Sequence, residues 1–245
     1  MIEIYRAACE NVKVLKQQAK SIKRMLNRAL ANHRWDEVNT LTKTYALLYS
    51  AYAEVTFLKM IHTPYGFSDS YINEIQKQRN LEEKWEKCFE LAFVAIMTDN
   101  NKGSISNQKL KLERILKEYI VKPSQIRNKI AHGQWKICLN SESTAVNSDT
   151  TALVADLDYV RIDILFNVYD IFSRCIEDLI ESPKRAHFEY FYSNCVELEE
   201  YLKTTKSFTK ESKLQVLQES PKIKNKPRLE CANQLLKKSA RRHPC

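Results

Sequence analysis

The chain has 245 residues, of which 44% are hydrophobic and 28% charged, a composition typical of a folded globular protein rather than a disordered one. Its three glycines are too few for the frequent turns of an all-β fold and for a glycine-rich phosphate loop. The net charge of +9 is concentrated near the end of the chain, because residues 203–245 hold 12 basic and 3 acidic residues.

Helical periodicity dominates the first half of the chain. Apolar residues recur at spacings of three and four, which predicts helices over about 3–33, 36–62, 69–98 and 106–120. The turn signal Thr63-Pro64-Tyr65-Gly66 separates the second helix from the third. After Val121-Lys122-Pro123-Ser124 the pattern predicts a separate short helix that Gly133 closes.

A different pattern follows this short helix. Residues 134–139 and 144–146 read as two short strands around an Asn-Ser-Glu-Ser turn, which predicts a small β-hairpin. Two further helices are predicted over 157–181 and 184–204. The expected fold is therefore all-α: a helical domain over 1–204 with one hairpin insertion.

The stretch 205–245 is predicted to be a basic, flexible tail, because Lys, Ser and Pro dominate it. A short helix over 229–238 is expected there, formed with a partner. Such a tail attracts RNA or another acidic partner without specificity, or serves only as a solvated extension.

The seven cysteines show no C-x-x-C pair, and the histidines outside the 125–133 stretch show no metal-ligand spacing, so no metal and no cofactor is predicted. We find no signal-peptide pattern and no apolar run long enough to span a bilayer. These observations predict a cytoplasmic protein with reduced thiols and no membrane partner.

One stretch carries recognisable chemistry: Arg127-Asn128-Lys129-Ile130-Ala131-His132-Gly133. Histidine exchanges protons near neutral pH, and the arginine fork matches a phosphate group. Asn128 and His132 are four residues apart and share a helix face. Because the 2′-hydroxyl of RNA supplies the nucleophile, such a pair is sufficient for RNA cleavage without a metal.

The run from Arg127 to His132 resembles the R-N-x-x-x-H motif of the HEPN superfamily (higher eukaryotes and prokaryotes nucleotide-binding). The order of elements over 1–204, several long helices and then the motif at the head of a late helix, is similar too. The resemblance implies a metal-independent endoribonuclease that dimerises and joins two motifs in one cleft. It makes Arg127 and His132 catalytic and Asn128 supporting, and it suggests a toxin or antiviral effector with a regulatory or antitoxin partner.

Other readings of the motif remain open. Arg127 could pair with a helix carboxylate while His132 ends the helix beside Gly133, both in purely structural roles. At the level of the whole chain, the bundle could be a catalytically silent HEPN module that docks a partner protein or nucleotide. A third possibility is an RNA-binding adaptor driven by the basic tail.

Four further residues are candidates for the same site. Glu54 could orient His132 or Arg127, since HEPN folds often direct an acidic residue inward from an early helix, or it could simply face solvent. Trp135 could stack on an RNA base or pack the hairpin against the bundle. Lys129 and Lys136 flank the motif and could contact phosphates.

Overall fold

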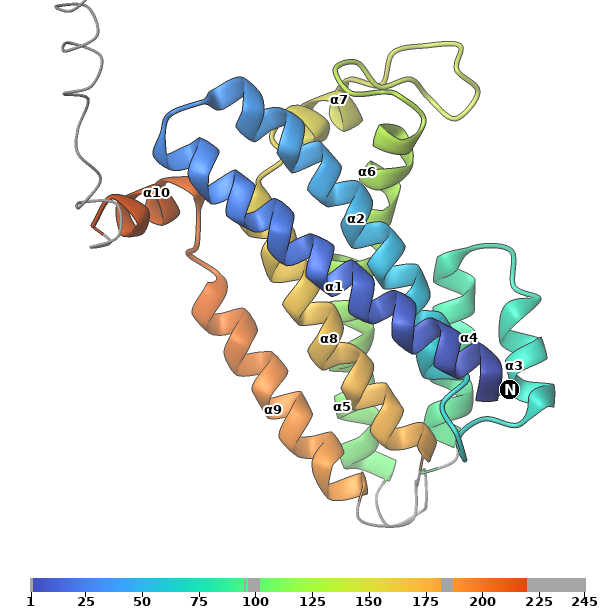
Figure 1. The fold of residues 1–245 in the computed structure, drawn as a ribbon. Coiled ribbons are helices and arrows are strands. Elements are labelled where there is room, and N and C mark those ends of the chain that lie inside the picture. The colour runs from blue at the N-terminus through green and yellow to red at the C-terminus, as the bar shows by residue number, and fades with distance from the viewer. Residues whose placement is uncertain (1, 95, 97–101, 182–186, 220–245) are drawn as a thin grey trace, which may run out of the picture.

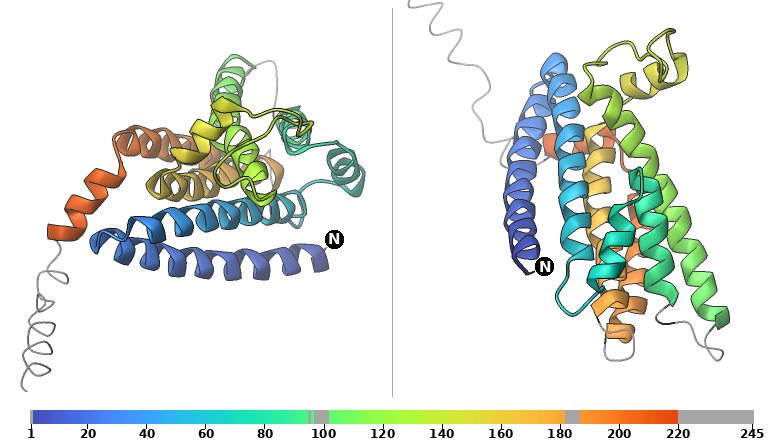
Figure 2. Two further views of the ribbon diagram at one scale, coloured as in Figure 1. Left: turned by 90° about the horizontal axis from the view of Figure 1, so that it is seen from above. Right: turned by 90° about the vertical axis from the view of Figure 1, so that its right-hand side faces the viewer.

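The computed structural model describes residues 2–94, 96, 102–181 and 187–219. All of its regular elements in this part of the chain are helical, which confirms the all-α prediction. Two long antiparallel pairs dominate: α1 (Ile2–Ala31) with α2 (Trp35–Ile61), and α8 (Tyr159–Glu181) with α9 (His187–Thr205) (Figure 1). Helix α2 packs on α8 and joins the two pairs, so α1 forms an outer layer over α2 (Figure 2).

Aromatic side chains fill the space between α2 and α8. Phe166 stacks on Tyr45 with ring centroids 5.0 Å apart and lies 5.1 Å from the ring of Tyr52. The buried Tyr169 hydroxyl donates to the Ala53 carbonyl oxygen at 2.7 Å, which satisfies its polar end. This packing fixes α2 relative to the rest of the bundle, and α2 carries Glu54.

The segment after α2 forms two helices where the sequence predicted one. Helix α3 (Asp69–Gln76) ends at Lys77, and α4 (Leu81–Val94) begins after Asn80. The Asn80 side chain accepts from the Glu83 backbone N–H at 2.9 Å, and the Glu83 carboxylate accepts from the Arg79 backbone N–H at 3.1 Å. These bonds satisfy backbone N–H groups at the N-terminus of α4, so the break in the helix is a capped helix start.

The opposite correction applies to residues 102–131, where the sequence predicted two helices separated at Pro123. Helix α5 (Lys102–Leu116) instead continues through the π-helical turn η1 (Lys117–Val121) into α6 (Lys122–Ala131). Pro123 has no N–H to donate to the Tyr119 carbonyl four residues earlier. The Tyr49 hydroxyl of α2 donates to that carbonyl at 3.1 Å, and the wider turn accommodates the proline.

The predicted β-hairpin after the motif is wrong: residues 134–147 form a loop in which a single antiparallel bridge joins Leu139 and Val146. Two backbone bonds flank this bridge, from the Asn140 N–H to the Ala145 carbonyl at 2.8 Å and from the Asn147 N–H to the Cys138 carbonyl at 2.7 Å, and side chains accept from further N–H groups. The Leu139 N–H donates to the Gln134 side chain at 2.8 Å, and the Cys138 N–H donates to Thr151 Oγ1 at 2.9 Å. Thr151 belongs to α7 (Ser148–Ala155), a helix that the sequence pattern did not indicate.

Beyond residue 205 the chain forms one more helix, α10 (Lys210–Glu219), which contacts α1 and α8. The remainder of the predicted basic tail, with the short helix expected over 229–238, lies outside the described residues. Among the helices that the structure describes, none is both long and apolar enough to cross a bilayer.

Candidate active site

The R-N-x-x-x-H motif occupies the last part of α6, whereas the sequence placed it at the start of a short helix. Since the π-turn joins α5 to α6, the motif lies near the carboxyl end of one long helical rod. His132 is the C-terminal cap residue, and its backbone N–H donates to the Asn128 carbonyl at 3.1 Å. Gly133 then adopts a φ of +78°, a conformation that glycine tolerates best, and the helix stops.

Arg127 reaches from α6 to α2. Its Nη2 donates to Glu54 Oε1 at 2.7 Å, in a pair whose side chains are 23% and 56% exposed respectively. The Arg127 Nε is buried, and the described residues offer it no acceptor. The guanidinium is thus held by one carboxylate oxygen, its Nε is closed to solvent, and its Nη1, which makes no hydrogen bond with the described residues, stays available to a ligand.

The two other motif side chains are free of the packing. Asn128 and His132 are exposed, and within the described part of the chain neither side chain makes a hydrogen bond or ion pair. The helix cap uses the backbone of His132, so capping does not account for its imidazole. A purely structural role for the motif therefore explains Arg127, through its ion pair with Glu54, but gives the His132 imidazole no function.

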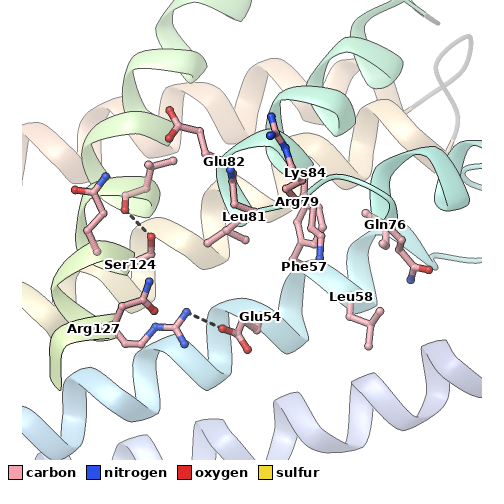
Figure 3. Close-up of a pocket in the computed structure, with 15 residues that line it drawn as sticks. Glu54, Phe57, Leu58, Gln76, Arg79, Leu81, Glu82, Lys84, Ser124 and Arg127 are labelled. Carbon is pink, nitrogen blue, oxygen red and sulfur yellow. Dashed lines mark hydrogen bonds and ion pairs between the residues drawn. The ribbon is translucent and has the colours of Figure 1, made fainter. Parts of the chain in front are cut away.

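A groove with a volume of about 960 Å³ adjoins the motif (Figure 3). Its apolar floor includes Phe57 and Ile61 of α2, Leu81 at the start of α4, and Val121. Ser124, Gln125, Arg127 and Asn128 of α6 form one bank, and the other consists of Gln76, Arg79, Asn80, Glu82 and Lys84 from the α3–α4 region. His132 does not belong to the lining, so a single chain does not bring it into the groove with Arg127.

The residues just after the motif hold the 134–147 loop against the bundle. Trp135 Nε1 donates to the Ile130 carbonyl at 3.0 Å, at the open end of α6, and Lys43 Nζ lies 5.7 Å from the indole ring centre. Lys129 Nζ donates to the Leu139 carbonyl at 2.7 Å. Trp135 and Lys129 thus serve packing and loop anchoring, whereas Lys136 is exposed and unpaired among the described residues.

Gln76 on the far bank is oriented by a buried histidine. His62, only 5% exposed, lies with its Nε2 3.3 Å from the amide nitrogen of Gln76. When the amide nitrogen donates to an unprotonated Nε2, the ring proton resides on Nδ1, which is buried and has no partner among the described residues. Burial lowers the pKa of His62 below its ordinary value, so this ring is held neutral.

The far bank was not foreseen from the sequence. Residues 76–84 gave no catalytic or binding pattern, and the sequence interpretation placed them inside one continuous helix. The one usable signal was Asn80-x-x-Glu83, a helix-start pattern that predicts a break there. Even a correct break would not have shown that this segment lies opposite Arg127.

Neither the side-chain clusters of the described residues nor comparison with known proteins points to a further site. Within the described residues, no group of three or more His, Cys, Asp or Glu side chains could hold a metal ion. Comparison of the chain with protein-family models, with curated proteins and with solved structures gave no significant match.

Proposed function

We propose that this protein is a metal-independent endoribonuclease of the HEPN type, with Arg127 and His132 as catalytic residues. The observation that carries the proposal is the state of the motif side chains at the end of α6. The His132 imidazole and the Asn128 amide face solvent and make no hydrogen bond or ion pair with the described residues. Arg127 stands at the edge of the groove, and its Nη1 makes no hydrogen bond with the described residues.

The proposed reaction is an intramolecular transesterification of RNA. The 2′-oxygen forms a bond to phosphorus while the bond from phosphorus to the 5′-oxygen breaks, which leaves a 2′,3′-cyclic phosphate and a free 5′-hydroxyl. His132 takes the proton from the 2′-hydroxyl, and that proton ends on the departing 5′-oxygen. Arg127 stabilises the negative charge on the phosphorane, and Asn128 hydrogen-bonds the phosphate or orients His132.

The position of His132 outside the groove favours a site made by two chains. In a two-fold symmetric dimer, His132 of one protomer can meet Arg127 of its partner, so that neither chain cleaves alone. Glu54 keeps the guanidinium at the bank of the groove until a phosphate competes for it. A role as a toxin or antiviral effector, restrained by a regulatory or antitoxin protein, rests on the family resemblance alone.

Mixing two inactive variants tests the composite site. Arg127→Ala and His132→Ala are each expected to abolish cleavage of RNA. When equal amounts are mixed and allowed to exchange subunits, half of the dimers are heterodimers with one intact Arg127–His132 pair, so about a quarter of the wild-type activity should return. No recovery, despite heterodimers seen by native mass spectrometry, would exclude the shared site.

A second candidate function is a catalytically silent module that docks a partner protein or a nucleotide. It is favoured by the Arg127–Glu54 ion pair, which neutralises the cation. This candidate predicts that His132→Ala leaves function intact, whereas removal of the chain beyond Thr205 abolishes it.

A further inference from the structure

The far bank of the groove carries two cations that the motif does not include. Lys84 lines the groove from α4 and makes no ion pair with any residue that the structure describes. Arg79 lines it from the α3–α4 junction; it pairs with Glu83 at 3.2 Å, yet its side chain is 88% exposed. A pair this exposed is worth little, so a phosphate can replace the carboxylate at small cost.

The surface between the two banks suits nucleobases. Phe57 and Ile61 form a buried apolar floor, and Phe57 is fixed by Trp85, whose ring centre lies 4.7 Å away. The amides of Gln76, Gln125 and Asn128 border this floor and present donors and acceptors of the kind that read base edges. Glu54 and Glu82 also line the groove, so three cations face two carboxylates there.

We propose that this groove binds a single-stranded RNA segment, with its backbone held on the far bank by Arg79 and Lys84 while the scissile phosphate lies at Arg127. The inference rests on the proposed function and adds the path of the substrate across α2. Unstacked bases of a single strand can lie on the floor, whereas those of a duplex are already stacked and paired. A volume near 960 Å³ is at the upper end of the range for small-ligand sites, which leaves room for a short strand segment.

The test is the salt dependence of RNA binding. The probe is a short fluorescein-labelled 2′-O-methyl RNA, which cannot be cleaved because its 2′-oxygen is blocked, and binding is followed by fluorescence anisotropy over a salt series. The variant is Arg79→Gln/Lys84→Gln. The matched control is Lys13→Gln/Lys20→Gln, which removes the same charge from exposed positions on α1, a helix that contributes nothing to the groove lining.

The slope of log Kobs against log salt is negative, and each lost phosphate contact makes it less negative by about 0.7 for a single strand. The slope of the groove variant should therefore be about 1.4 less negative than that of the wild-type protein. The control should keep the wild-type slope, and circular dichroism should show both variants folded. An unchanged slope in the groove variant, or an equal loss in the control, would overturn the inference.

The same data separate this inference from the proposed function. Groove-dependent binding of the blocked probe without any cleavage of unmodified RNA would support the binding site and refute the nuclease. Cleavage that depends on His132, together with an unchanged salt slope in the groove variant, would support the nuclease and refute the binding site.

Discussion

Replacement of Glu54 by glutamine should strengthen RNA binding. The Glu54 carboxylate holds Arg127 Nη2 at 2.7 Å and competes with an RNA phosphate for the same guanidinium. Glutamine keeps an oxygen acceptor at this position but removes the charge, so the guanidinium stays in place while the competing anion is lost.

The size of the effect follows from the exposure of the pair. Its side chains are 23% and 56% exposed, and ion pairs of this kind contribute about 0.2–1 kcal/mol. With about 1.4 kcal/mol per tenfold change in an equilibrium constant, the variant should bind the blocked RNA probe about 1.4- to 5-fold more tightly. The free energy of unfolding should fall by no more than about 1 kcal/mol.

Anisotropy titrations at one salt concentration measure this change. Glu82→Gln is the matched control, because it removes the same charge from the same groove but forms no ion pair with Arg127. The gain from Glu54→Gln should exceed that of the control and should disappear in an Arg127→Ala background. Weaker binding by Glu54→Gln, or a gain no larger than that of Glu82→Gln, would refute the competition.

Three stability predictions follow from buried contacts. Tyr49→Phe should cost about 1–3 kcal/mol in urea unfolding, because the hydroxyl that donates to the Tyr119 carbonyl is lost beside the proline; a loss under about 0.5 kcal/mol would contradict this. Gly66→Ala should cost about 1–3 kcal/mol in the same assay, since an added Cβ would lie 2.5 Å from Ile180 Cγ2; a neutral change would show that Ile180 moves freely. The lowered pKa of His62 means that the unfolded chain binds a proton more readily, so stability should fall as the pH drops through about 6.5 and below. His62→Gln should flatten the dependence of melting temperature on pH in this window, and an unchanged dependence would exclude His62 as the cause.

The long helices could be predicted from the sequence because each repeats apolar residues at helical spacing over several turns. The predicted 3–33 and 157–181 correspond to α1 over Ile2–Ala31 and α8 over Tyr159–Glu181. Errors arose where side chains took over backbone bonding. Asn80 starts a new helix inside an apolar pattern, and Tyr49 lets a helix pass through Pro123. Asn80 and Glu83 form a local helix-start pattern inside the apolar periodicity, whereas Tyr49 cannot be recognised from local sequence because it lies on a different helix.

In the candidate site, too, some features could be predicted from local sequence and others depend on contacts between helices. The motif residues are adjacent in the chain, so their spacing alone suggested the chemistry. Glu54 was proposed from its place in an early helix, and its bond to Arg127 appears only when α2 packs against α6. Arg79 and Lys84 approach the motif through the packing of α3 and α4, which periodicity does not encode. Local pattern therefore indicated the candidate catalytic residues, and tertiary packing determined the surface beside them.

The most direct test of the central claim is cleavage of total RNA by the purified protein in the presence of EDTA, compared with its His132→Ala variant. A 2′,3′-cyclic phosphate on the products of the wild-type protein, with the variant inactive but folded, is the predicted result. Equal cleavage by both proteins, or none by either under conditions where the wild-type dimer forms, would contradict the assignment of His132 as a catalytic residue.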